Sequence, residues 1–168
     1  MVEMIEYLAI PEERIKLLKK NKSWVERLKK FCNAELNLNE EIGIKCEDPL
    51  MLLRVKNVLK AFGRGFSFED ALTLLDEDYF FETIEVKEYA GKSRKRQIVL
   101  KGRVIGREGK IKKMIERICN VKIVIYGKTI SIIGKWNDLE KAKKAVEMLL
   151  EGKKHGTVYN FLERQRGS

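Results

Sequence analysis

The residues in this sequence best suited to chemistry form a short glycine loop. Gly106 and Gly109 enclose two residues, and cations lie around them: Arg107, Lys110, Lys112 and Lys113. A phosphate backbone can approach a protein backbone closely only where no Cβ intervenes, and glycine provides that clearance. A helix is predicted to begin directly after the loop, so its free N–H groups and positive dipole end would face an anion. The pattern predicts a loop that grips phosphates.

Other kinds of site find little support. Cys32, Cys46 and Cys119 are widely spaced without a CxxC pair, so we predict buried thiols in a reducing compartment and no zinc site. His155 is the only histidine and is interpreted as structural, since no acid pair or second ligand lies near it in sequence. No catalytic triad, acidic cluster or Walker loop is present, so we expect no enzymatic activity, no metal, no cofactor and no small-molecule substrate.

Charge is distributed unevenly along the chain. Residues 1–80 contain 13 Lys/Arg and 15 Asp/Glu, a net charge of −2, whereas residues 81–168 contain 22 and 10, a net charge of +12. The charge-rich surface of a heat-adapted protein would explain abundant Lys and Glu but not this asymmetry. The asymmetry favours one polyanion-binding surface in the second half. No apolar run approaches a membrane span and the N-terminus lacks a secretion signal, so we expect a cytoplasmic protein.

The sequence repeats itself faintly at an offset of 87 residues. Phe31-Cys32-Asn33 falls on Ile118-Cys119-Asn120, and apolar positions coincide elsewhere. Each copy shows the order strand, helix, helix, strand, strand, helix. We therefore predict an α+β protein with two small antiparallel sheets, each backed by helices.

The second copy carries the clearer pattern. A strand is predicted over 80–89, a short helix over 97–105 and an amphipathic helix over 110–119. Strands over 121–125 and 129–133 follow, and then a helix from Trp136 that Asn137 would cap. Val158, Phe161 and Leu162 predict a closing helix that docks on this copy.

The first copy has the same order but lacks the glycines. A capping box at Ser23 opens a helix, short strands follow at 36–38 and 42–44, and Asp48-Pro49 starts a helix that Gly63 ends. Ser67 is placed to cap a short helix through Leu75. Lys19-Lys20-Asn21-Lys22 occupies the position of the glycine loop, so close phosphate clamping should fail here.

The apolar pair, glycine loop and amphipathic helix over 104–115 resemble the signature of the KH domain, an RNA- and single-stranded-DNA-binding module. The resemblance implies two type I KH-like units: a degenerate one at 1–64, a helical linker at 65–78, and an intact one at 79–168 with a C-terminal helical extension. KH loops clamp about four nucleotides and leave the bases in an apolar groove. The RNA-binding residues predicted on this basis are Arg103, Ile105, Gly106, Arg107, Glu108, Gly109, Lys110, Ile111, Lys112, Lys113, Val121 and Ile123.

Further segments resemble one family, the archaeal tandem-KH proteins related to the eukaryotic Partner of NOB small-subunit assembly factor. These segments are Ile10-Pro-Glu-Glu-Arg-Ile15, Gly63-Arg-Gly-Phe-Ser67, Gly102-Arg-Val-Ile-Gly106, Tyr126-Gly-Lys-Thr129, His155-Gly-Thr-Val-Tyr159 and Phe161-Leu-Glu163. The resemblance implies a non-catalytic, single-stranded RNA-binding factor for ribosome assembly, acting near the 3′ end of small-subunit rRNA. It also implies the alpha subunit of initiation factor two, or a ribosome-assembly nuclease, as a protein partner.

Two alternatives stay open on the sequence. One is a protein-interaction scaffold linked to translation initiation, whose basic face meets an acidic partner. The other is a subunit of an RNA-processing complex, although an exosome-cap protein would need an additional RNA-binding β-barrel that no stretch here can build.

Overall fold

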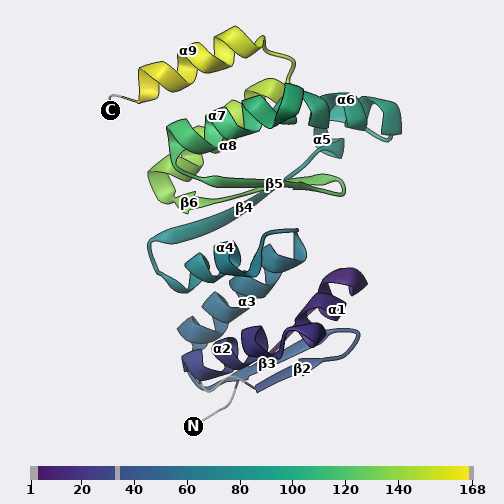
Figure 1. Cartoon of the computed structure of the whole chain (residues 1–168), viewed down its shortest axis with the longest axis vertical. Coiled ribbons are helices and arrows are strands. Elements are labelled where there is room, and N and C mark those ends of the chain that lie inside the picture. Colours follow the sequence, from purple (N-terminus) through teal and green to yellow (C-terminus); the bar gives the residue numbers. More distant parts are fainter. Residues whose placement is uncertain (1–3, 33–34, 167–168) are drawn as a thin grey trace. The chain divides into compact units, whose positions relative to one another are not determined.

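The computed structural model describes residues 4–32 and 35–166, and the chain divides into two compact units, Met1–Glu77 and Asp78–Ser168 (Figure 1). In the described residues each unit contains one three-stranded antiparallel sheet. The strand orders are β1-β3-β2 and β4-β6-β5, so in both sheets the last strand of the unit lies in the middle. The predicted α+β class with two type I KH-like units is confirmed.

The helices and strands follow the predicted order in each unit. The first unit contains β1 (Met4–Leu8), α1 (Glu12–Lys20), α2 (Lys22–Cys32), β2 (Glu35–Leu38), β3 (Ile42–Cys46), α3 (Pro49–Gly63), α4 (Phe68–Leu72) and the 3-10 helix η1 (Thr73–Leu75). The second contains β4 (Tyr79–Glu85), α5 (Lys87–Ala90), α6 (Arg94–Ile105), the 3-10 helix η2 (Arg107–Gly109), α7 (Lys110–Cys119), β5 (Lys122–Tyr126), β6 (Thr129–Lys135), α8 (Trp136–Leu150) and α9 (His155–Gln165). No helix among the described residues is long and apolar enough to span a membrane.

The repeat in the sequence corresponds to a repeat of helices and strands in the structure. Helices α3 and α8 begin and end at positions that differ by 87 residues, the offset found in the sequence. Strands β2 and β5 begin at the same offset, as do β3 and β6. The offset is smaller earlier in the units, since β1 and β4 begin 75 residues apart and α1 and α6 begin 82 residues apart. The second unit inserts α5 and a basic connection between β4 and α6, and it has a longer connection between α6 and α7.

In each unit the helices cover one face of the sheet, as Figure 1 shows. In the first unit, Ile42, Ile44 and Cys46 of β3 are buried, whereas Gly43 and Lys45 between them are partly exposed. In the second unit, buried side chains of β5, β6, α6, α7 and α8 share one hydrophobic core. In β3 this alternation separates the helix-facing side from the other side, whereas the first six residues of β6, Thr129 to Gly134, are all buried.

The segment after α3 belongs to the first unit, which corrects the prediction of a separate helical linker over 65–78. Phe68 is buried and stacks on Trp24, with ring centroids 5.0 Å apart, and its ring meets Phe62 edge-on at 6.3 Å. The Arg14 guanidinium donates to the carbonyl oxygens of Phe62 at 2.8 Å and Phe66 at 2.6 Å. The predicted Ser67 cap is confirmed, because its hydroxyl accepts from the Asp70 N–H at 3.1 Å.

Some local predictions fail because packing overrides the pattern. The strand predicted over 80–89 ends at Glu85, and the chain turns into α5 while Val86 is fully buried. Helix α6 begins three residues before the predicted start, where the Ser93 hydroxyl accepts from the Arg96 N–H at 3.2 Å. Asn137 does not cap α8, because that helix already begins at Trp136 without a side-chain cap.

The prediction of three buried thiols holds only in part. Cys119 is a free and buried thiol, and burial raises its pKa to about 11. Cys46 is disulfide-bonded, so the prediction is wrong for this residue. The side chain of Cys32 lies outside the described residues.

The closing helix predicted from the tail is confirmed. Val158 and Leu162 of α9 are buried in the core of the second unit, and α9 packs on α7 and α8. Figure 1 shows α9 beyond α8, on the side of the helices away from the sheet.

We predict that Phe68→Ala lowers the free energy of unfolding of the first unit by about 3 kcal/mol, because a ring buried against Trp24 and Phe62 is lost. The chain's two tryptophans make this measurable, since Trp24 belongs to the first unit and Trp136 to the second. Denaturant unfolding followed by fluorescence in a Trp136→Phe background reports the first unit alone. The control Leu53→Ala, at a side chain that is 52% exposed, should cost less than about 1 kcal/mol. A loss no greater than the control would exclude 65–77 from the core of this unit.

Candidate nucleic-acid interface

The glycine loop of the second unit has a backbone that few residues can adopt. Gly106 has φ 74° and ψ 174°, and Gly109 has φ 75° and ψ 13°. Glu108 between them is also left-handed, with φ 57°. Among the described residues the only other non-glycine with positive φ is Asn120, at the end of α7. Glu108 is thus the strained residue of the loop, and proteins keep such strain mainly where function or packing demands it.

Gly106 is required by packing inside the unit. A Cβ at this position would lie 2.3 Å from Cγ1 of Ile111 and 2.9 Å from its backbone nitrogen. The sequence suggested that this glycine makes room for an RNA backbone. The structure shows that it makes room for Ile111 in the first turn of α7. Ile111 is half-buried against the core, so its position fixes the loop.

Gly109 is the glycine that faces open space. A Cβ there would meet only the Lys113 side chain, at 3.7 Å. It precedes α7 directly, and no side chain caps that helix. The first N–H groups of α7 are therefore available to an anion, and the helix dipole favours negative charge at this end.

Exposed cations surround this uncapped end. Arg107, Lys110 and Lys113 come from the loop and the first turn of α7. Glu108 lies 3.9 Å from the Lys110 ammonium, but both side chains are more than two-thirds exposed, so the attraction is weak in water. Glu108 therefore sits beside this cation and leaves the cluster with a positive excess.

The predicted apolar groove floor requires a correction. Val121 and Ile123 are buried at 5% and 1% exposure and belong to the hydrophobic core, so their side chains do not line a groove. Strand β5 is an edge of its sheet, so one side of its backbone is not paired with a strand. The side chains that alternate with Ile123 are Lys122, which is exposed, and Val124, which is partly buried. Ile105, Ile111, Val124 and Ile125 are only partly buried, so apolar side chains do reach the surface here.

Arg103 also differs from the prediction. Its guanidinium donates to the Leu149 carbonyl oxygen at 2.9 Å and to that of Lys153. These carbonyls belong to the last turn of α8 and the connection to α9, where a cation complements the helix dipole. Arg103 connects α6 to the end of α8, and no local sequence pattern predicts these distant acceptors.

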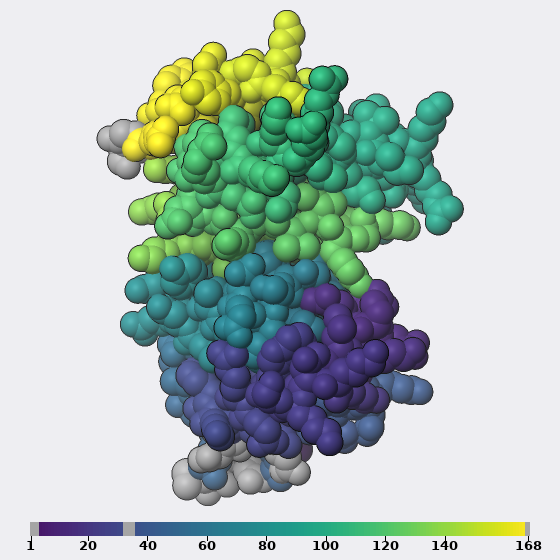
Figure 2. Space-filling model, in the orientation of Figure 1, coloured from purple at the N-terminus to yellow at the C-terminus, as the bar shows by residue number. Residues whose placement is uncertain are grey.

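The start of α6 is a cationic patch that the predicted site omitted. Lys92, Arg94, Lys95 and Arg96 are all exposed, and none of them forms an ion pair within the described residues. Basic residues at a helix N-terminus oppose the helix dipole, so they reduce the stability of α6. In Figure 2 the teal atoms of this segment project from the surface of the second unit. The net charge of +12 over residues 81–168 had indicated a basic surface in this unit, although not its position.

The corresponding turn of the first unit has no loop at all. Helix α1 ends at Lys20 and α2 begins at Lys22, so Asn21 alone connects them. Asn21 has φ −112°, and its amide donates to the Leu17 carbonyl oxygen at 2.8 Å. A one-residue turn with a local hydrogen bond leaves no glycine-lined approach for a phosphate.

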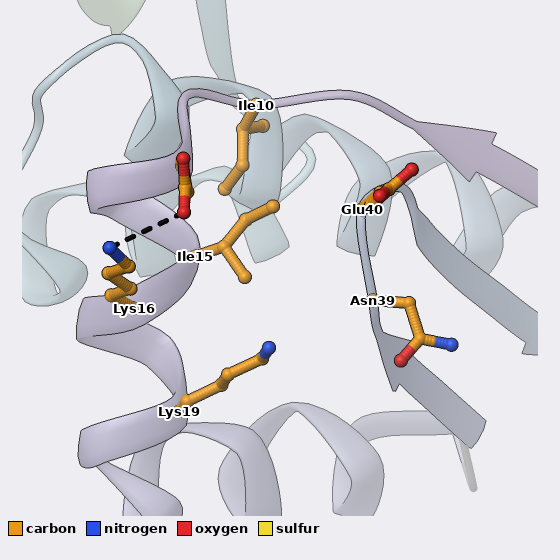
Figure 3. A pocket seen from close by; sticks show the side chains of 7 residues that line it. Ile10, Ile15, Lys16, Lys19, Asn39 and Glu40 are labelled. Atoms are coloured by element: carbon orange, nitrogen blue, oxygen red, sulfur yellow. Dashed lines mark ion pairs between the residues drawn. The ribbon is translucent and has the colours of Figure 1, made fainter.

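The first unit nevertheless has two hollows around this turn. The larger, about 710 Å³, lies between α1 and the turn from β2 to β3, and Lys19 reaches into it from α1 toward Asn39 (Figure 3). The second is lined by Lys19, Lys22, Val25, Glu26, Lys29 and Leu38. It runs along α2 beside β2, which is where a KH groove would lie.

No cluster of three metal-ligating side chains occurs in the part of the chain that the structure describes. The Cys119 thiol is buried with a pKa of about 11, so it stays protonated at neutral pH and is a poor nucleophile. The arrangement of the second unit is suited to binding an anion.

Comparison with known proteins identifies the family. The eukaryotic type KH domain, KH-domain type I, matches residues 80–167. A KH domain-containing protein of Methanocaldococcus jannaschii is 38% identical over 96% of this chain and 74% of its own length. The chain belongs to the PNO1/Dim2 family.

Other relatives extend the PNO1/Dim2 assignment. Pre-rRNA-processing protein PNO1 of Saccharomyces cerevisiae is 34% identical over 68% of this chain, which spans 42% of that protein. The structure of Dim2p from Pyrococcus horikoshii has a TM-score of 0.84 at 35% identity and covers 96% of this chain and 99% of that one. Dim2p in a complex of the same organism, described as a/eIF2alpha-aDim2p-rRNA, has a TM-score of 0.89 at 33% identity over 99% of this chain and 96% of that one.

The two glycines should respond differently to Ala. We predict that Gly106→Ala destabilises the second unit by roughly 3 kcal/mol or more, because it adds a clash with Ile111 to a backbone that only glycine adopts easily. Gly109→Ala should cost about 1 kcal/mol, since only the left-handed backbone opposes it. Thermal unfolding followed by Trp136 fluorescence in a Trp24→Phe background measures both variants. Equal costs would contradict the packing role of Gly106.

Proposed function

We propose that this protein is a non-catalytic assembly factor of the small ribosomal subunit, which acts in the cytoplasm and binds single-stranded rRNA near its 3′ end. The second unit is the RNA-binding unit of this proposal. The observation that carries it is the uncapped start of α7 at a glycine loop, ringed by the exposed cations Arg107, Lys110 and Lys113. The first unit has the two corresponding helices, α1 and α2, but Asn21 alone joins them and the loop is missing.

The names of the relatives support rRNA as the ligand and ribosome assembly as the process. One relative is a pre-rRNA-processing protein, and a structural neighbour was solved in a complex with rRNA. The same complex contains a/eIF2alpha, so the alpha subunit of initiation factor two is a partner in this proposal. A ribosome-assembly nuclease is the second protein partner that we propose.

The two units have different roles in this proposal because the connections between their first two long helices differ. RNA phosphates would meet the N–H groups of α7 and the cations around Gly109. The first unit would contribute packing or a protein contact, because Asn21 closes its turn with a hydrogen bond to Leu17. Pull-down of the protein from cells followed by RNA sequencing tests the substrate class. We expect small-subunit rRNA to be enriched, and no RNA enrichment would favour a protein-interaction scaffold.

The grip of the loop can be tested by Gly109→Asp. Aspartate tolerates the left-handed backbone better than most residues, so the fold should persist while a carboxylate opposes the phosphate. We expect at least a tenfold loss of affinity for a single-stranded RNA, with an unchanged circular dichroism spectrum. Gly152→Asp is the matched control, because Gly152 also has positive φ and open space around it but lies between α8 and α9.

A second control separates the two units in the same titration. Replacing Lys19, Lys20 and Lys22 by Ser removes three charges from the first turn and should cost less than Gly109→Asp. Unchanged affinity in Gly109→Asp would show that the glycine loop is not the grip. A larger loss from the lysine variant would place the grip in the first unit.

The salt dependence of binding should report phosphate contacts. If four to six contacts form, the single-strand rule predicts a slope of log affinity against log salt of about −3 to −4. A KH groove takes unpaired bases, so single-stranded RNA should bind more tightly than a duplex of the same sequence. Titration of both labelled RNAs at several salt concentrations measures this. Equal affinity for the duplex, or a slope near zero, would contradict a KH groove in the second unit.

A further inference from the structure

The internal repeat locates the groove of the second unit. The hollow along α2 and β2 in the first unit is lined by residues whose counterparts at the offset of 87 are Gly106, Gly109, Lys112, Lys113, Glu116 and Ile125. By this correspondence the two glycines would form the loop end of the groove, and Ile125 of the edge strand β5 would lie on its far side. Lys112 and Glu116 of α7 stand between them.

Glu116 makes an unusual contact in this position. Its Oε2 accepts a hydrogen bond from the backbone N–H of Ile123 at 3.0 Å, and its Oε1 lies 3.3 Å from the Lys112 ammonium. The Glu116 and Lys112 side chains are 20% and 30% exposed. The carboxylate is thus held from two sides, yet it remains in contact with solvent.

The Glu116 carboxylate changes which backbone groups at the edge of β5 are available to a base. The Ile123 N–H points away from β6, because it reaches a side chain of α7. Backbone groups alternate along an antiparallel strand, so the N–H and C=O of Ile125 also point away from β6. A base in the groove would meet the backbone of Ile125 and the carboxylate of Glu116, while the Ile123 N–H is already used.

A carboxylate held in this way can recognise only hydrogen-bond donors on a base. Each oxygen carries two lone pairs, and the hydrogen bonds to Ile123 and Lys112 use one on each oxygen. One lone pair on each oxygen remains, and the carboxylate cannot donate. Two adjacent donors on a base match it best, and guanine alone presents two, N1–H and the N2 amino group, on its Watson–Crick edge. Adenine, cytosine and uracil each place an acceptor beside their donor.

We propose that Glu116 selects the base in this groove and favours an unpaired guanine, which donates N1–H and N2–H to the two carboxylate oxygens. This proposal rests on the function proposed above, since it names the base that the same groove takes. Lys112 and the Ile123 N–H position the carboxylate, and Glu116 makes the contact with the base. The sequence alone placed Lys112 among phosphate ligands and gave Glu116 no role.

The test uses purified full-length protein and single-stranded RNA decamers that differ only at guanine. One decamer contains guanine, the second has inosine at the same positions, and the third has adenine. Inosine lacks only the N2 amino group. We expect the wild-type protein to bind the inosine decamer about tenfold more weakly, the effect of losing one hydrogen bond to a charged group. The adenine decamer should bind more weakly than the guanine decamer by a similar or larger factor.

Two substitutions of Glu116 test whether this residue sets the base preference. Glu116→Gln keeps an acceptor for the Ile123 N–H but adds a donor, and amides pair well with adenine, so the preference should move from guanine to adenine. Glu116→Ala should bind all three decamers within about twofold of one another, because the loop cations still hold the phosphates. Lys29→Ala is the matched control at the counterpart position of the first unit and should keep the wild-type preference.

The outcomes separate this proposal from the function on which it rests. Tight binding of all three decamers by the wild-type protein with no guanine preference would overturn the role of Glu116 and leave the RNA-binding function standing. The same result follows if Glu116→Ala keeps the wild-type discrimination. A wild-type protein that binds none of the decamers would overturn both. Circular dichroism of each variant shows whether a loss reflects unfolding, and the ratio between decamers reports selection independently of overall affinity.

Discussion

The contact between Gly106 and Ile111 is the constraint on which the proposed RNA-binding site depends. Helix α7 can begin immediately after the loop only because no Cβ separates these residues, and a Cβ would lie 2.3 Å from Cγ1 of Ile111. No side chain caps this first turn, so its N–H groups beside Gly109 are available to an anion. Arg107, Lys110 and Lys113 then surround an end of the helix that already favours anions. The same rigid placement of α7 sets Glu116 against the edge strand.

The two units show how little a fold says about binding. They share the order of elements and an offset of 87 residues at both ends of α3 and α8. They differ where the first helix passes into the second, since Asn21 alone joins α1 to α2 while four residues join α6 to α7. Asn21 satisfies its amide locally by bonding to Leu17. The first unit therefore keeps a KH-like architecture without the feature that exposes a helix N-terminus to phosphate.

Positive charge in the second unit serves more than one purpose. Arg103 donates a hydrogen bond to the Leu149 carbonyl oxygen at the end of α8 and so connects α6 to α8. Lys112 positions a carboxylate. Lys92 and Arg94–Arg96 form no ion pairs with the residues that the structure describes, and they oppose the dipole of α6, which makes them a second surface where a polyanion is favoured. Net charge indicates the class of ligand, whereas hydrogen-bonding partners decide which cations are available to it.

The sequence by itself determined the repeat, the order of elements, the limits of α7 and the place of the glycine loop. These features depend on apolar periodicity, on capping residues such as Ser67 and on glycines, all of which act on neighbours in the chain. Only the tertiary structure decided that Val121 and Ile123 are core residues, that 65–77 packs on α3, and that Arg103 binds the end of α8. Burial of an edge-strand side chain and hydrogen bonds between distant residues depend on which elements meet. The pairing of Glu116 with the Ile123 N–H is of this kind, because the two residues meet only when α7 packs beside β5.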